Sequence, residues 1–574
     1  MRKGLFLFCP LLFGSLLLFL KNQTIEAITE NYQQEKQLTA IGCAPGADDY
    51  TADATGKFIQ VLPGWGNHSY SISTSIDSAQ LYFNQGLTMY YSYHSREAVA
   101  SFREAARFDS TNAMLYWAQA LAMGPSYNFG YAYKMRPAIP AVLEKMNRYA
   151  PLATEKEKDL ITAMNSRYNV GDSLDKDRTA LNISYANAMK PLVEKYADDA
   201  DIKALYTDAV MLIHAWDFWN NDGTPKAWTP ELVRNCVDIL ARDPRHPGAL
   251  HYYIHVTEAS RNPEVAVFSA DSLIKLFPGV AHMVHMSSHE YERIGHYARG
   301  VVANEKAGQS LVLYDSLAKG LFASVHVPHY YAVEAYCALS GAMYVKALQK
   351  TNTCRHSVEP NNEDLYSQFL YMFPELAMVR LGKWQDIIND TTSVNSEWTY
   401  AGLLNDFARG MAYAKTGNSL LAEQHLRQLR LKKKDKALAE KFDPLSNTPL
   451  DCATVAENIL LANIRFQQKK HSEALAAIKA AIRTEDQLIY AEPKDWMLPA
   501  RQYLGAFHLH LKNWKEAEKV YREDLVWNPG NGWSLVGLYK ALSAQGKTVE
   551  LAYLKEQYLI SFSEADEVPS TSAY

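Results

Sequence analysis

Two short stretches of the chain carry closely spaced side chains of the types that bind metal ions. Both stretches have the spacing His-x3-His-x2-Glu, and the second follows the first by 34 residues. The members are His251, His255 and Glu258 in "HYYIHVTE", and His285, His289 and Glu292 in "HMSSHEYE". Imidazole and carboxylate groups suit divalent transition metals. The pattern therefore predicts a site for Zn, Fe, Cu or Mn.

The spacing differs from the motifs of known catalytic metal sites. A zincin carries Glu directly after its first His, where this chain has Tyr252 and Met286. The Glu-x-x-His motif of di-iron helix bundles is also absent from the sequence. There is no Walker loop, no Gly-x-Gly-x-x-Gly and no Gly-x-Ser-x-Gly sequence. We therefore expect no nucleotide or organic cofactor.

Further histidines gather around the two stretches. Nine of the seventeen histidines fall between residues 246 and 329, which is far more than an even spread would place there. His282 precedes His285 by three residues, and His329 stands at the start of the next helical stretch. We add His282 and His329 to the predicted metal ligands.

Helical periodicity recurs along the chain, and strand signals are scarce. Residues 79–112 carry Gly86, Ala98 and Ala105 at positions 8, 20 and 27 of a 34-residue unit, with Phe102 at position 24. Later stretches repeat the pattern with Gly410, Ala422, Ala462, Ala474, Gly505 and Ala517. This pattern resembles the tetratricopeptide repeat (TPR), in which small residues at these positions let two antiparallel helices approach closely.

The resemblance implies an all-α fold, an α-solenoid of TPR-like helix-turn-helix repeats that is degenerate over residues 125–235. One unit cannot bury its apolar face alone, so neighbouring units stack and form an extended concave surface. The predicted segments are a signal peptide over 1–27, an irregular segment over 28–78, an N-terminal array with a His-rich groove over 79–365, a C-terminal array over 366–562 and a flexible tail over 563–574.

The metal-binding pattern matches the register of two repeats that begin at Pro247 and Ala281. Each first helix then has His at positions 5 and 9 and Glu at position 12, within a stripe about 60° wide on one helix face. In TPR proteins these positions line the concave groove, and packed helices lie about 8–10 Å apart. The resemblance therefore implies that imidazoles of neighbouring helices meet there. Glu258 and Glu292 are expected to bind the metal or to orient the imidazoles.

The first 27 residues have the order of a secretory signal. Arg2 and Lys3 precede an apolar run over residues 4–20, and Ala27 supplies a small residue for cleavage. The mature chain is therefore predicted to be exported, either periplasmic or secreted, with no membrane span. An uncleaved N-terminal anchor is the alternative.

The composition limits the kinds of partner and the number of disulfides. A net charge of -5 and a pI near 6.4 lack the basic footprint of a nucleic-acid-binding protein, so no nucleic acid partner is expected. Five cysteines follow residue 27, an odd number at wide spacing. They allow one or two disulfides at most, and Cys337 and Cys354 are the nearest pair.

Three longer stretches resemble a group of exported bacterial TPR proteins: "HPGALHYYIHVTEAS", "HMVHMSSHEYERIGHYARG" and "FNQGLTMYYSYHSREAVASFREAARFDS". The resemblance implies a fold and an export route but no reaction. We therefore predict an exported solenoid that binds a protein, peptide or small molecule in its concave groove, with a His/Glu transition-metal site. Two alternatives stay open. One is a metal-dependent hydrolase or oxidase/oxygenase, and the other is a metal-free envelope scaffold that binds glycans or peptides.

Overall fold

The structure is a computed structural model, and it describes residues 52–128, 133–171, 177–318, 327–442 and 446–574. The signal peptide predicted over 1–27 lies outside the described residues. Residues Ala44–Tyr574 form one compact unit. Within the described ranges, no helix is both long and apolar enough to cross a bilayer.

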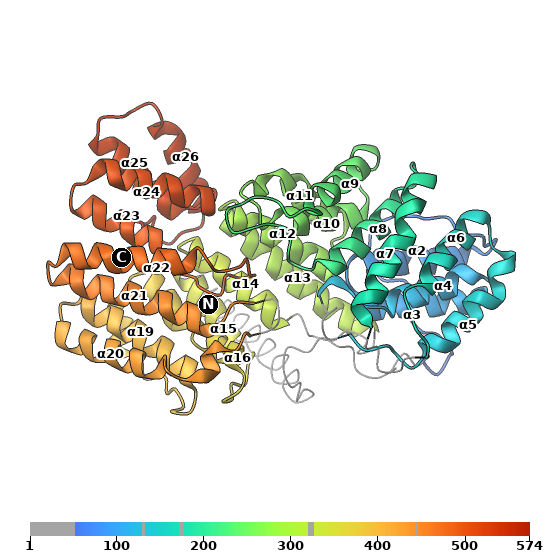
Figure 1. The fold of residues 1–574 in the computed structure, drawn as a ribbon, viewed down its shortest axis with the longest axis horizontal. Coiled ribbons are helices and arrows are strands. Elements are labelled where there is room, and N and C mark those ends of the chain that lie inside the picture. Colours follow the sequence, from blue (N-terminus) through green and yellow to red (C-terminus); the bar gives the residue numbers. More distant parts are fainter. Residues whose placement is uncertain (1–51, 129–132, 172–176, 319–326, 443–445) are drawn as a thin grey trace, which may run out of the picture. The chain divides into compact units, whose positions relative to one another are not determined.

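The regular secondary structure of the described residues consists of helices (Figure 1). The helices up to residue 318 are α2 (Asp77–Tyr91), α3 (Ser95–Phe108), α4 (Ala113–Ala122), α5 (Ile139–Tyr149), α6 (Glu155–Asn165), α7 (Arg178–Lys195), α8 (Ala200–Ile213), α9 (Thr229–Arg242), α10 (Pro247–Thr257), α11 (Val267–Leu276), α12 (Ala281–Arg293) and α13 (Tyr297–Ala318). The later helices are α14 (Val327–Ser340), α15 (Tyr344–His356), α16 (Leu365–Tyr371), α17 (Phe373–Arg380), α18 (Trp384–Asn389), α19 (Thr399–Lys415), α20 (Ser419–Lys432), α21 (Pro449–Gln467), α22 (His471–Glu485), α23 (Ala500–His510), α24 (Trp514–Trp527), α25 (Gly532–Ala544) and α26 (Leu551–Ser561). The only β pairing in this part of the chain is an isolated bridge between Trp219 and Pro225. The predicted all-α class is confirmed.

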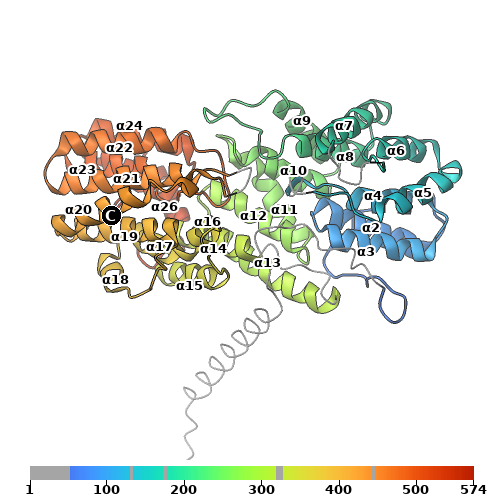
Figure 2. The same cartoon turned by 60° about the horizontal axis from the view of Figure 1, so that its bottom comes forward.

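Consecutive helices pair as hairpins, and the hairpins stack on one another (Figures 1 and 2). Turns of three residues join the pairs α2/α3, α12/α13, α14/α15, α19/α20, α21/α22 and α23/α24. First helices of successive pairs also contact one another, as α10 does with α12 and α19 with α21. This arrangement is the predicted solenoid of TPR-like repeats.

Two glycines show why small residues recur in the repeat. At Gly86 a Cβ atom would lie 2.5 Å from the ring of Phe102, and at Gly505 it would lie 2.3 Å from the ring of Tyr521. Neither position has room for a methyl group. An alanine at either glycine would therefore push the two helices of its hairpin apart.

Buried apolar side chains form two main clusters. One cluster extends from Ile59 to Tyr314 and the other from Tyr297 to Ala573. The two clusters meet at α13.

The C-terminal residues 563–574, predicted as a flexible tail, contact the last repeats. The Ser572 hydroxyl donates to the carbonyl oxygen of Gln502 at 2.7 Å. The ring of Tyr574 contacts Trp533 edge-on. These side chains therefore have buried partners on the last repeats.

Residues 52–76 contain no helix and pack across the first repeats. The Tyr314 hydroxyl donates to the carbonyl oxygen of Pro63 at 2.9 Å. Further along this segment, His68 reaches Asp201 on α8. The segment therefore ties α13 to the helices around α8.

The described cysteines, Cys236, Cys337, Cys354 and Cys452, are buried free thiols. Cys337 packs against Gly300 of α13, whereas Cys354 lies on α15. The nearest pair expected from the sequence therefore forms no disulfide, because each thiol fills its own position in the core.

Candidate metal centre

Three neighbouring helices position the histidines. α12 packs against both α10 and α14, in the green to yellow-green part of the ribbon (Figures 1 and 2). α10 begins at Pro247 and α12 at Ala281, so the helix starts match the predicted repeat register. The side chains are His251 and His255 on α10, His282, His285 and His289 on α12, and His329 on α14.

The first three-histidine group consists of His251, His255 and His282, whose ligating nitrogens lie within 4.8 Å of one another. The Nδ1–H of His251 donates to the carbonyl oxygen of Tyr91 at 2.6 Å. The Nδ1–H of His255 donates to Glu258 Oε1 at 2.9 Å. Because a carbonyl and a carboxylate only accept, the Nδ1 atoms of both rings carry the proton. The Nε2 atoms of His251 and His255 are buried without a hydrogen-bond partner, and each offers a lone pair.

The second three-histidine group consists of His285, His289 and His329, again with ligating nitrogens within 4.8 Å. The Nδ1–H of His285 donates to Asn304 Oδ1 at 2.6 Å. The Asn304 amide holds this orientation because its Nδ2 donates to the carbonyl oxygen of Gly300 at 3.1 Å. The proton of His285 is therefore fixed on Nδ1, and its Nε2 presents a lone pair.

Two imidazole nitrogens of this group face each other at close range. The Nε2 atoms of His285 and His289 lie 2.8 Å apart, and the Nδ1 of His289 is 2.8 Å from Glu492 Oε2. With protons on both Nδ1 atoms, two lone pairs would point at one another. Such a contact is stable only with a cation between the rings, which is either a proton or a metal ion.

One carboxylate connects the two groups. Glu258 accepts from His255 through Oε1 and from His289 through Oε2, the latter at 3.1 Å. A second carboxylate, Glu492, reaches His289 from the segment between α22 and α23. A carboxylate on the far nitrogen of an imidazole fixes the ring and raises its basicity as a metal ligand.

Burial and the two carboxylates set the charge of these rings. His251 and His255 are 0% and 2% exposed, and burial lowers the pKa of His251 well below its usual range and that of His255 to about 3. Both rings are therefore neutral at pH 7. Burial also lowers the pKa of His289, but Glu492 and Glu258 outweigh it and raise that pKa to about 10. Without a metal ion, His289 holds an extra proton next to His285.

Tyrosine rings enclose both groups. The centroid of Tyr93 lies 4.6 Å from His251, that of Tyr127 4.8 Å from His255, and that of Tyr330 4.0 Å from His285. Tyr93 has a φ of 57°, a left-handed conformation that costs a non-glycine residue about 1–2 kcal/mol. This conformation of the turn between α2 and α3 places the Tyr93 ring against the histidines.

Two features differ from the sequence-based expectation. Glu292 joins neither histidine group, because its side chain lines a separate cavity together with the cations Arg293 and Lys494. The histidines are also not on an open groove surface, since His289 is only 3% exposed. The α2–α3 turn and the segment that carries Glu492 contact these histidines and cover this helix face.

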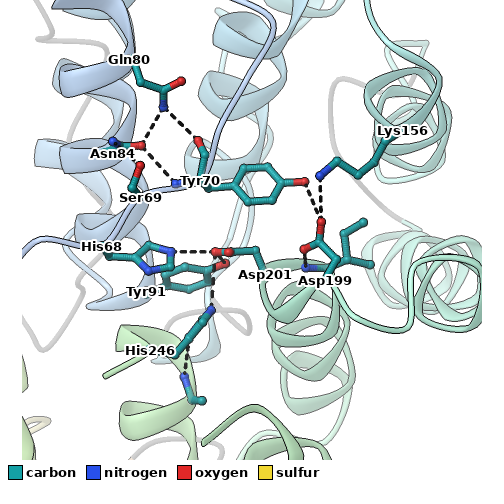
Figure 3. A network of polar contacts seen from close by, with 12 residues as sticks. His68, Ser69, Tyr70, Gln80, Asn84, Tyr91, Lys156, Asp199, Asp201 and His246 are labelled. Atoms are coloured by element: carbon teal, nitrogen blue, oxygen red, sulfur yellow. Dashed lines mark hydrogen bonds and ion pairs between the residues drawn. The ribbon is translucent and has the colours of Figure 1, made fainter. Parts of the chain in front are cut away.

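A third cluster of potential ligands, His68, Asp201 and His246, is occupied by hydrogen bonds instead (Figure 3). Asp201 Oδ1 accepts from His68 Nε2 and from the Tyr91 hydroxyl, each at 2.8 Å, and lies 3.5 Å from His246 Nε2. The Nδ1 of His246 accepts the backbone N–H of Ala249 and so caps α10. The proton of His246 is therefore on Nε2, and this ring cannot bind a metal through Nε2 without losing its capping bond.

Tyr91 links this network to the first three-histidine group. Its hydroxyl is held by Asp201, as Figure 3 shows, and its backbone carbonyl oxygen receives the Nδ1–H of His251. The network therefore positions a carbonyl group that orients the His251 ring.

Several residues of the centre have no sequence signal. Tyr91, Tyr93 and Asn304 support the rings from α2, its following turn and α13. Glu492 comes from the far C-terminal array. No spacing rule connects these positions with the His-x3-His pattern, so only the packing of repeats brings them together.

No family model matches this sequence, and none of the curated proteins matches it. Solved structures with similarity to this chain include the human IFIT1 dimer with m7Gppp-AAAA, at 12% identity over 85% of this chain and 96% of that chain with a TM-score of 0.28. The yeast Tom70 matches at 11% identity over 76% and 90%, with a TM-score of 0.27. The P58(IPK) TPR domain matches at 13% identity over 59% and 93%, with a TM-score of 0.18. At these values the comparisons say nothing about ligands of this chain.

Proposed function

We propose that this protein binds divalent transition metal ions, one in each three-histidine group, inside a TPR-like helical scaffold. The observation that carries the proposal is the direction of the protons. The Nδ1–H groups of His251, His255, His285 and His289 all point to acceptors. Their Nε2 lone pairs therefore converge within the two groups. All-imidazole donor sets favour Zn, Cu or Fe over hard cations such as Mg, and we expect zinc.

The distances suit such an ion. A tetrahedral zinc ion with Zn–N bonds of about 2.0–2.1 Å separates its nitrogen ligands by about 3.3–3.4 Å. The ligating nitrogens of each group lie within 4.8 Å of one another, and the Nε2 atoms of His285 and His289 are 2.8 Å apart. Small ring rotations would bring both groups to this geometry.

A metal count tests the proposal directly. Protein purified without a histidine tag should contain two zinc ions per chain by plasma mass spectrometry. His255→Ala or His285→Ala should leave one ion, and the double variant none. The matched control is His508→Ala, because His508 is a buried histidine of the C-terminal array that belongs to neither group. A wild-type count near zero would remove the proposal.

A metal-dependent enzyme is the second candidate. Each group supplies three histidines, and catalytic zinc sites use three protein ligands and leave a fourth position for water. A metal ion there would supply a Lewis acid or an activated water. In cobalt-substituted protein, azide should then change the visible absorption. An unchanged spectrum at saturating azide would contradict an open coordination position.

We also propose that the protein acts outside the cytoplasm and that its repeats present a surface to a protein, peptide or small-molecule ligand. The apolar run after Arg2 and Lys3 supports export, and the stacked repeats support a binding scaffold. Amino-terminal sequencing of protein from the periplasmic or medium fraction should find a mature end near residue 28. Full-length protein confined to the cytoplasm would contradict export.

A further inference from the structure

A small cavity lies beside the histidine groups and has a different character. Its volume is about 20 Å³, and Arg293, Arg380, Lys494 and Glu292 are among its lining residues. It adjoins the metal centre because Glu292 follows His289 by one helical turn on α12. The segment before α23 that supplies Glu492 also supplies Lys494.

Arg380 is a buried cation with an unused donor. Arg380 is 5% exposed, and its guanidinium carbon lies 3.9 Å from the centroid of the Trp533 ring. Nη1 donates to Gln502 Oε1 at 2.6 Å. The Nε atom is buried without a hydrogen-bond partner. This N–H therefore remains available to an acceptor.

The other two cations are bound to neutral groups. Arg293, which is 4% exposed, donates to the carbonyl oxygens of Glu258 at 2.7 Å and Ser260 at 3.1 Å. Lys494 donates to Asn528 Oδ1. Among the described residues, neither these cations nor Arg380 forms an ion pair within 4.0 Å. Buried cations without a counter-ion are costly, so an added anion would stabilise this cavity.

The carboxylates near the cavity attract these cations only from beyond ion-pair distance. Burial raises the pKa of Glu292 despite Lys494 and Arg293, and it lowers the pKa of Lys494 as well. Asp524 is 1% exposed and accepts from neutral donors, among them Gln502 Nε2 at 3.2 Å and the Ser534 hydroxyl at 2.6 Å. The excess of positive charge among the lining side chains therefore comes from Arg293 and Arg380.

The size of the cavity selects the anion. One water molecule needs about 10–15 Å³ of such volume, so about 20 Å³ admits one or two water-sized groups. The two oxygen atoms of a carboxylate match that space, whereas the four oxygen atoms of sulfate or phosphate exceed it. The planar fork of an arginine also matches a carboxylate. We infer that this cavity binds the carboxylate group of a small monoanion such as formate or acetate.

This carboxylate pocket shares no residue with the two three-histidine groups, so the inference does not depend on bound metal. Isothermal titration of chelator-treated wild-type protein with formate and acetate should show saturable binding, while sulfate and neutral acetamide should show none. Arg380→Gln should weaken acetate binding roughly ten- to hundredfold, the loss expected for one charge-assisted hydrogen bond. Arg501→Gln is the matched control, because Arg501 pairs with Asp486 and does not line the cavity.

If circular dichroism shows that Arg380→Gln does not fold, Lys494→Met carries the same test. Acetate binding should also persist in the His255→Ala/His285→Ala double variant, so that the pocket and the metal centre are judged separately. Three results would overturn the inference: no saturable heat with either carboxylate, equal acetate affinity in the wild type and the cavity variants, or sulfate that competes as well as acetate does.

Discussion

Two sets of clustered histidines lie between residues 68 and 329, and they differ in where their protons point. In the cluster of His68, Asp201 and His246, the imidazole protons face the shared carboxylate. In the three-histidine groups, the protons of His255 and His289 face outward to Glu258, and the lone pairs face inward. Proximity is similar in both sets. The direction of the protons therefore separates a structural network from a centre that can hold a cation.

Removal of metal should have the largest effect on stability. A ligand present at a thousandfold excess over its dissociation constant stabilises the folded state by about 4 kcal/mol. The melting temperature of the wild type should therefore fall on chelation and recover with zinc. The His255→Ala/His285→Ala variant should melt at one temperature under both conditions. A wild-type melting temperature that does not change with chelator would contradict metal binding by the histidine groups.

The two glutamates at repeat position 12 offer a sharper test. Glu258→Gln should weaken zinc binding roughly 10- to 100-fold, because this carboxylate orients one ring in each group. Glu292→Gln should leave zinc affinity unchanged, because Glu292 lines the neighbouring cavity. Competition with a chromophoric chelator measures both values. Equal losses of zinc affinity in the two variants would show that the negative charge of each glutamate matters, and not its hydrogen bonds to the histidines.

Low pH should destabilise the protein through the network around Asp201. Burial alone would raise the pKa of Asp201, but hydrogen bonds from His246 and His68 outweigh it and hold that pKa below its usual range. Because its pKa is lower in the folded state, ionised Asp201 stabilises the fold at pH values above its pKa in the unfolded chain, about 3.9. This contribution is lost as the pH falls from there toward the pKa of the folded state. Urea midpoints at pH 5 and pH 3 should therefore differ more in the wild type than in Asp201→Asn. A parallel response of the two proteins would refute the linkage.

The smallest change in zinc content is expected from the capping histidine. His246→Ala removes the side-chain acceptor at the start of α10, which costs about 1 kcal/mol in the free energy of unfolding, and the loss of the buried ring adds the cost of a cavity. Its zinc content should equal that of the wild type. Urea unfolding and a metal count measure the two quantities. Loss of zinc from this variant would place His246 among the ligands.

The sequence predicts the repeats because their packing leaves a local record. Gly86 and Gly505 are small for a steric reason that recurs in each unit. The register of the four paired histidines follows from the repeat length, and the helices begin where that register requires. The grouping of His282 with His251, and of His329 with His285, depends on how neighbouring helices pack.

The rest of the centre depends on contacts that no local pattern records. Glu258 and Glu292 occupy equivalent repeat positions, yet only Glu258 touches the histidines. Glu492 and Tyr93 arrive on connecting segments whose paths depend on the whole array. The contacts of the C-terminal residues belong to the same class, since buried partners such as Gln502 lie far away in the sequence.

The contribution of Glu492 also has a consequence for biosynthesis. All six histidines leave the ribosome well before this residue, which belongs to the segment between α22 and α23. A nascent chain that stops short of it would expose the imidazoles without their second carboxylate. In the proposed metal centre, the carboxylate contacts of His289 are therefore complete only late in translation.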